Sequence, residues 1–217
     1  MLAGAGSHRA ASSIWEMVRM NLEDEIQGLR DARRLHDAAT RAVEGYGPEV
    51  LGFLVTLLRD ENSANEVFSQ TCEDLWKGLD RFEGRSSLRT WFYVLARHAA
   101  ARFRRAPHRR AGRRVGLSEV SEIAERVRSQ TLAHLRTDVK DGFAAIRDAL
   151  SEDDRALLVL RVDRGLSWND IARVFLLDNQ EATVEQVAMK LRKRFERLKV
   201  EIRDRAREAG LVPEQEP

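Results

Sequence analysis

Residues 82–105 have the sequence FEGRSSLRTWFYVLARHAAARFRR, in which aromatic side chains and arginines are interleaved. A helix is expected from Leu88 to Arg105, aromatic at its start and cationic at its end. Aromatic faces stack on any base and cations pair with the backbone, so this composition is typical of proteins that bind single-stranded or melted DNA. The candidate contacts are Arg85, Ser86, Arg89, Trp91, Tyr93, Arg97, His98, Arg102 and Arg105. Two alternatives stay open: Trp91 belongs to the core, or the arginines form only a solvated basic surface.

The residues before this stretch predict two further helices. Gly47-Pro48-Glu49 is interpreted as a helix start, because proline is tolerated in a first turn. The next helix has an apolar face that includes Val67, Phe68 and Leu75, and an opposite polar face. That polar face carries Asn65, Glu66, Ser69 and Gln70.

Residues 107–141 are interpreted as a linker between two helical units. Its first part is basic and rich in turn-forming residues. Its second part predicts a short amphipathic helix, with Val120, Ile123, Ala124, Val127, Thr131 and Leu135 spaced by three and four. Whether that helix packs on a domain or docks on a partner stays open. Residues 1–32 are interpreted as a loosely ordered extension with one helix, and residues 211–217 as a tail.

Residues 142–210 have the pattern of a helix-turn-helix. Ser151 and Ser167 are predicted to cap helices, each with an acid three residues later, and Gly165 separates those two helices. A long helix is expected from Thr183, with a core stripe that includes Ala188, Leu191 and Phe195. The outer residues at its start would enter the major groove, and the alternative is a solvated face of an ordinary helical hairpin.

The candidate contacts with duplex DNA are Thr183, Glu185, Gln186, Val187, Lys190 and Arg194. Gln186 can pair bidentately with adenine, Glu185 can accept from a cytosine amine and Val187 can touch a thymine methyl. The basic residues further along would meet phosphates and position the helix.

Charge and cysteine content restrict the possible functions. The 37 basic residues nearly balance 35 acidic ones, yet from Arg97 to Arg114 there are eight arginines and no acid, which indicates a polyanionic partner. The single cysteine, Cys72, excludes an internal disulfide and a cysteine-based metal site. Catalytic, metal and cofactor sites are not expected, and neither is membrane insertion, because no stretch approaches the roughly 20 apolar residues of a span. The expected compartment is the cytoplasm.

Two segments together resemble the extracytoplasmic-function sigma factors of bacterial RNA polymerase. Residues 82–105 look like the family's promoter-melting helix, in which an aromatic-rich RTW element precedes a helix ending in arginines. The stretch SEDDRALLVLRVDRGLSWNDIARVF, followed by ATVEQVAMKLRKRFERL, is similar to the family's final domain. The likeness spans about residues 33–106 and 142–207, in the family's order.

The resemblance implies an all-α protein of two small helical domains joined by a linker. Sigma region 2 (residues 33–106) would bind core polymerase and the minus-ten element, and sigma region 4 (residues 142–210) would read the minus-thirty-five element. Asn65, Glu66, Ser69 and Gln70 would be the residues that dock on the clamp helices of the β′ subunit. Further implied partners are the β subunit, promoter DNA and an anti-sigma factor. His98, Arg102 and Val187 depart from the family's usual asparagine, aspartate and arginine, and the turn before Thr183 is about two residues longer.

Three other functions compete with this interpretation. A free-standing helix-turn-helix regulator would bind duplex DNA without polymerase, but it would not need the aromatic and basic stretch 82–105. A protein that keeps the sigma fold but sequesters polymerase or an anti-sigma factor is the second. An enzyme is the least supported, because the five histidines are scattered and no acid pair or metal spacing is present.

Overall fold

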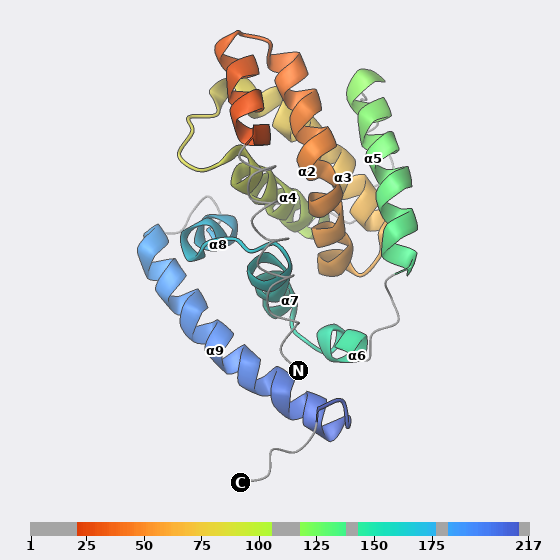
Figure 1. The fold of residues 1–217 in the computed structure, drawn as a ribbon, viewed down its shortest axis with the longest axis vertical. Helices are drawn as coiled ribbons and strands as arrows, with labels where there is room; N and C mark the ends of the chain where they lie inside the picture. The colour runs from red at the N-terminus through yellow and green to blue at the C-terminus, as the bar shows by residue number, and fades with distance from the viewer. Residues whose placement is uncertain (1–20, 106–117, 138–142, 177–181, 213–217) are drawn as a thin grey trace, which may run out of the picture.

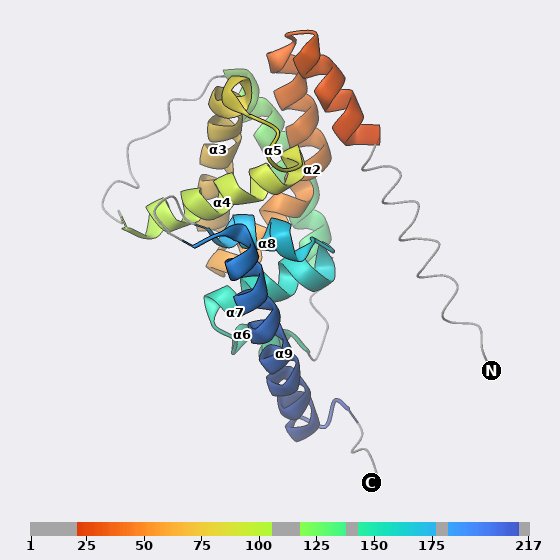
Figure 2. The same ribbon diagram turned by 90° about the vertical axis from the view of Figure 1, so that its left-hand side faces the viewer.

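The computed structural model describes residues 21–105, 118–137, 143–176 and 182–212, and every regular element in these ranges is helical. The expected all-α fold is thus confirmed. Figure 1 shows α2, α3, α4 and α5 gathered in one unit and α6 to α9 in a second unit below it. Figure 2 shows α4 crossing between α2 and α3 on one side and α8 on the other.

The first unit is built on α2 (Leu35–Leu58), α3 (Glu61–Gly78) and α4 (Leu88–Arg105). The bounds of α4 are those that the sequence predicts. Arg59, with φ 58°, ends α2 in a left-handed conformation, and the Asp60 side chain then caps α3 by accepting from the Ser63 amide. A short 3₁₀ turn, Leu79–Arg81, follows α3.

Pro48 lies inside α2, so the interpretation of residues 47–49 as a helix start is wrong. A proline inside a helix removes one backbone hydrogen bond and favours a break. Here α2 has buried side chains on both sides of that position, among them Val43 and Tyr46 before it and Val50 and Leu51 after it. Burial of one continuous apolar face against α3, α4 and α5 outweighs the local preference.

The predicted boundary at residue 33 cuts through the first unit. Residues 21–31 form a helix, and its Leu22 and Ile26 belong to the buried core. Gly45 permits this contact, because a Cβ at that position would lie 2.3 Å from a methyl carbon of Leu22. Glu23 adds polar contacts, accepting from the Tyr46 hydroxyl at 2.8 Å and from the Leu88 amide at the start of α4. The described part of the expected extension is therefore structural.

The open question about the linker helix is answered by α5 (Ser118–Thr137). Its residues Ile123, Ala124, Val127 and Thr131 are buried, and it packs on α2 and α3. Part of the expected linker thus belongs to the first unit, while residues 106–117 and 138–142 lie outside the described ranges.

The second unit consists of α6 (Phe143–Asp148), α7 (Glu152–Leu158), a π-helical turn (Val159–Asp163), α8 (Trp168–Phe175) and α9 (Val184–Glu208). Ser151 and Ser167 cap α7 and α8, as the sequence predicts, and Thr183 caps α9. Gly165 ends the turn with φ +65°. Leu157 and Leu160 are fully buried, whereas Val162 in the π-helical turn is 59% exposed.

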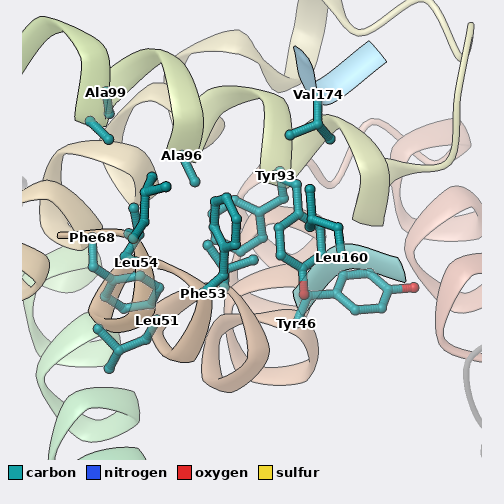
Figure 3. Packing of buried hydrophobic residues seen from close by; sticks show 14 of the residues in the cluster. Tyr46, Leu51, Phe53, Leu54, Phe68, Tyr93, Ala96, Ala99, Leu160 and Val174 are labelled. Carbon is teal, nitrogen blue, oxygen red and sulfur yellow. The ribbon is translucent and has the colours of Figure 1, made fainter. Parts of the chain in front are cut away.

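The two units share one continuous core. Figure 3 shows Leu160 and Val174 of the second unit in the same buried cluster as Tyr46, Phe53 and Tyr93 of the first. The Phe53 and Tyr93 rings meet edge to face, with centroids 5.4 Å apart. The units therefore pack on each other directly, in addition to their connection through the chain.

Replacement of Ile26 tests whether residues 21–31 are part of the fold. Ile26→Ala should lower the free energy of unfolding by about 2–5 kcal/mol, because Ile26 is 1% exposed. Gly28→Ala is the matched control on the same helix, since nothing lies within 4 Å of the added Cβ. It should raise stability by about 0.5–1 kcal/mol. Urea unfolding followed by circular dichroism measures both, and an unchanged midpoint for Ile26→Ala would contradict this assignment.

Candidate nucleic-acid interface

The aromatic residues of α4 are divided between the core and a half-buried edge. Phe92 and Tyr93 are fully buried. Trp91 is half-buried and stacks on Phe82 with ring centroids 4.9 Å apart, and its outer edge lies against Gly78. The alternative that Trp91 packs against the core is therefore observed. The burial of Tyr93 contradicts its interpretation as an exposed residue that stacks on bases.

Arg89 is held in an internal ion pair. It donates from Nε and Nη2 to the two carboxylate oxygens of Glu49 at 2.6 and 2.8 Å, and the side chains are 12% and 14% exposed. Burial alone would lower the pKa of Arg89, but the hydrogen bonds and charge of Glu49 outweigh it and raise that pKa. This bidentate pair fixes Arg89 as a structural cation, so its predicted contact with DNA is not available in this arrangement.

Arg97 points toward the second unit. Its Nη2 donates to Asp153 at 2.5 Å, and its guanidinium lies 4.2 Å from the centroid of the Phe175 ring. The side chain is 11% exposed. The other α4 candidates are more accessible: Arg85, Arg102 and Arg105 are exposed, and Ser86 and His98 are half-buried. Arg102 nevertheless pairs with Asp74 of α3.

The start of α9 is held by a reciprocal capping box. The Thr183 hydroxyl accepts from the Gln186 amide at 3.3 Å, and the Gln186 side-chain oxygen accepts from the Thr183 amide at 3.1 Å. The sequence pattern Thr-x-x-Gln carries this signal, although the prediction assigned Gln186 to base reading alone. Since Gln186 is exposed and its oxygen is engaged, its amide nitrogen is the part left to contact DNA.

The outer face of α9 is less uniform than predicted. Glu185 and Lys190 are exposed. Val187 is half-buried and packs against the core, so its interpretation as a fully outward residue is wrong. Arg194 is held by two acids at the start of α7, from Nε to Asp154 at 2.7 Å and from Nη1 to Asp153 at 3.4 Å.

The carboxyl of Asp154 is a titratable group that pairs with Arg194 of α9. Burial alone would raise the pKa of its carboxyl, but hydrogen bonds from Arg194 and Ser151 outweigh burial and hold that pKa below its ordinary value. The same pairing raises the pKa of Arg194. The sequence analysis placed Asp154 only beside the cap Ser151 and missed the pairing of these acids with arginine, although three consecutive acids after that cap are a visible signal.

Candidates from the two predicted DNA-binding surfaces line one hollow. Arg97 and Phe175 face Val187, Lys190, Arg194 and Arg197 of α9 across a cavity of about 500 Å³. The residues that line this hollow come mainly from α4, α8 and the first half of α9. The structure thus brings Arg97 beside three of the six duplex candidates, while Arg85 and Arg105 lie outside it.

The candidate docking face of α3 is partly covered by α5. The Ser69 hydroxyl accepts from Arg128 Nη1 at 2.7 Å and donates to the carbonyl of Asn65 at 3.0 Å. Gln70 is half-buried and donates to Asp74 at 3.0 Å, while Glu66 is exposed. Glu66 and Gln70 are therefore the accessible part of this face.

Within the described ranges, no group of three or more histidine, cysteine, aspartate or glutamate side chains is arranged to hold a metal ion. Among those same residues, no helix combines the length and the hydropathy that crossing a bilayer requires.

Comparison with known proteins gives consistent matches. Residues 42–110 match the family model described as Sigma-70 region 2. The chain is 30% identical over 135 residues to the RNA polymerase sigma-H factor of Pseudomonas aeruginosa, an alignment that covers 59% of this chain and 70% of that protein. It is 28% identical over 166 residues to the ECF RNA polymerase sigma factor SigX of Bacillus subtilis, covering 73% and 84%. The RNA polymerase sigma factor YlaC of Bacillus subtilis is 24% identical over 170 residues, covering 73% and 92%.

Because of the Asp154–Arg194 ion pair, part of the free energy of unfolding should depend on pH in the acid range. The pKa of Asp154 is lower in the folded state than in the unfolded state. Its contribution to the free energy of unfolding is therefore present above the ordinary carboxyl pKa of about 4, and it is lost as the pH falls through the lower pKa of the folded state. Asp154→Asn should therefore cost about 1–2 kcal/mol near pH 7, a range that allows for solvent screening of the 34% exposed Arg194. The cost should shrink below about pH 4.

Urea unfolding at several pH values measures this difference. Asp163→Asn is the control, because it removes an exposed carboxylate on the same unit. A wild-type-minus-variant difference that stays constant from pH 3 to pH 7 would contradict the assignment.

Proposed function

Because the chain belongs to the extracytoplasmic-function sigma factors of RNA polymerase, which direct transcription initiation, we propose how its two units divide the work of promoter recognition. The observation that carries the proposal is the match of residues 42–110 to Sigma-70 region 2, which contains all of α4. A free-standing regulator, the alternative left open by the sequence, is not the function that the matches support.

The first unit is proposed to contact the minus-ten element through α4 and the loop before it. Arg85, Arg102 and Arg105 are exposed cations that can meet backbone phosphates, and Ser86 and His98 lie half-exposed between them. Trp91 presents a half-buried ring that is already stacked on Phe82. Tyr93 is not part of the proposed surface, because it is buried, and Arg97 joins the surface only when the second unit moves away.

The second unit is proposed to read the minus-thirty-five element with the start of α9. Thr183, Glu185, Gln186 and Lys190 lie in its first two turns, where base edges of the major groove come within reach. Val187 and Arg194 line the hollow beside them and would contact DNA only after the hollow opens.

Core polymerase is the proposed partner of α3. Glu66 and Gln70 form an accessible polar pair that suits the clamp helices of the β′ subunit, with Asn65 and Ser69 at the edge covered by α5. Contacts with the β subunit and with an anti-sigma factor are further proposed interactions. RNA synthesis belongs to the core enzyme, so no catalytic residue is proposed, and the place of action is the cytoplasm, where transcription takes place.

Run-off transcription with purified core polymerase, with and without this protein, tests the proposed function. The expected result is that core polymerase makes a promoter-dependent transcript only when this protein is added. Binding of duplex DNA without any effect on transcription would contradict it.

Charge reversal on α3 should separate polymerase binding from folding. Glu66→Lys with Gln70→Lys should reduce co-purification with core polymerase at least tenfold, because an added lysine pair replaces an acid and an amide at the proposed contact. The helical circular dichroism should stay unchanged, since Glu66 is exposed.

The matched control for that pair is Asp24→Lys with Gln27→Lys. It makes the same change of charge and residue type on an exposed face of the helix at residues 21–31. Its binding should equal that of the wild type. Equal binding by the Glu66 and Gln70 variant would move the docking surface elsewhere.

Two substitutions at Gln186 distinguish its two roles. Gln186→Glu keeps the capping box, since Thr-x-x-Glu closes it equally well, but a carboxylate cannot donate to adenine. This variant should lose about 1–3 kcal/mol of adenine preference at one position of the minus-thirty-five element while its melting temperature is retained. Gln186→Ala should lose both the preference and about 1 kcal/mol of stability.

Holoenzyme binding to a promoter library randomised at that element measures the preference. Glu196→Gln, an exposed change further along α9, is the control and should leave the preference profile unchanged. If Gln186→Glu also leaves that profile unchanged, Gln186 is a capping residue only, and the reading residues lie elsewhere on α9.

A further inference from the structure

We propose that the packing of the two units against each other is an autoinhibited state of this sigma factor. In this state the acidic first turn of α7 occupies the arginines of α4 and α9 in the place of DNA phosphates. The inference rests on the proposed function, because it requires α4 and α9 to be the promoter-binding helices.

Arginines from both DNA-binding helices converge on the first turn of α7. That turn consists of Glu152, Asp153 and Asp154. Asp153 accepts from Arg97 of α4 at 2.5 Å and from Arg194 of α9 at 3.4 Å. Arg104 of α4 pairs with Glu152. A carboxylate and a phosphate both accept charge-assisted hydrogen bonds from a guanidinium, so the turn presents to these arginines the chemistry that a DNA backbone would present.

The arginine of the central pair is largely shielded from solvent, whereas the Asp153 side chain is 44% exposed. Arg97 is 11% exposed and lies over the Phe175 ring at 4.2 Å, an arrangement that adds a cation–π contact. Ion pairs that are partly removed from water are stronger than fully exposed pairs. Two further arginines of the first unit reach backbone carbonyls of the second: Arg89 to Arg164 at 2.9 Å and Arg59 to Asp148 at 3.1 Å.

Apolar packing supports these charged contacts. Leu160 and Val174 of the second unit are buried in the core that contains Tyr93 and Ala96 of α4 (Figure 3). Opening the interface would expose these side chains. The closed state is thus held by both a buried apolar patch and a set of ion pairs, and the ion pairs are the part that ionic strength and charge substitution can weaken.

This arrangement cannot engage both promoter elements. The names of the minus-ten and minus-thirty-five elements place them about 25 base pairs apart, which is roughly 85 Å along the duplex at about 3.4 Å per base pair. In the structure Arg97 of the first surface and Lys190 and Arg194 of the second line one hollow of about 500 Å³. The two units must therefore separate before the promoter can be bound through both surfaces.

Neutralising two of the acids in the first turn of α7 tests the proposal in the full chain. Glu152→Gln with Asp153→Asn should enlarge the radius of gyration of the free protein in small-angle X-ray scattering. It should also raise the affinity of the free chain for a minus-thirty-five duplex about three- to tenfold, because the binding-competent fraction increases. Neither residue is among the proposed DNA contacts. The charge-conserving swap Glu152→Asp with Asp153→Glu should stay closed, and Asp31→Asn with Asp163→Asn removes two exposed carboxylates outside the interface as a second control.

The wild-type chain supplies an independent measurement. Raising the ionic strength should enlarge its radius of gyration toward that of the neutralised variant, since salt screens the ion pairs. An unchanged radius in both the variant and the salt series would overturn the proposal, even if the variant bound DNA more tightly.

Run-off transcription keeps this test apart from the test of the proposed function. With core polymerase present, the wild type and the neutralised variant should give equal amounts of transcript. Absence of transcript from both would defeat the proposed function. A change of size without a gain in DNA affinity would show an opening interface that does not inhibit, and would overturn the autoinhibition.

Discussion

The structure depends on α4 having two buried sides at once. One side packs on α2 and α3, and the other carries Tyr93 and Ala96 into the cluster that includes Val174 of α8. The Arg89–Glu49 pair secures this position, because a bidentate pair that is nearly buried tolerates little rotation of either helix. Removal of either partner would leave a charge without compensation in a site with little access to water. The position of every proposed DNA contact on α4 follows from this packing.

Electrostatics then determines which arginines are accessible. The segment from Arg97 to Arg114 contains eight arginines and no acid, which indicates a polyanionic partner. In the fold, acids that are distant in the sequence neutralise several of them: Asp74 pairs with Arg102, Glu152 with Arg104 and Asp153 with Arg97. A basic segment therefore does not equal a basic surface, and the nearly balanced net charge of the chain has a structural counterpart in these pairs.

The sequence predicted what is local and missed what is distant. The bounds of α4 and the caps of α7 and α8 follow from periodicity and from side chains three residues apart, so they could be predicted directly. The capping box of α9 is equally local, but it was missed because Gln186 was assigned to base reading. Pro48 misled because the burial of α2 on both sides of it is a tertiary effect. Leu22 and Ile26 gave too short an apolar pattern to reveal their burial. Tyr93 was misplaced because α8, far along the chain, contributes to the core beside α4. The partners Glu49 and Asp153 could not be identified among so many charges.

The capping box at the start of α9 has a consequence for how the promoter preference of such a protein can change during evolution. Gln186 closes the helix start, and its amide is the group proposed to reach the groove, so under that proposal one side chain would serve both stability and recognition. Glutamine and glutamate are the residues that complete a capping box at this position. Substitutions of Gln186 that keep the capping box are therefore limited to glutamate, unless Thr183 and its surroundings change at the same time. The sets of genes that two diverging copies control would separate more readily through neighbouring positions, such as Glu185 and Lys190, whose side chains have no part in the cap.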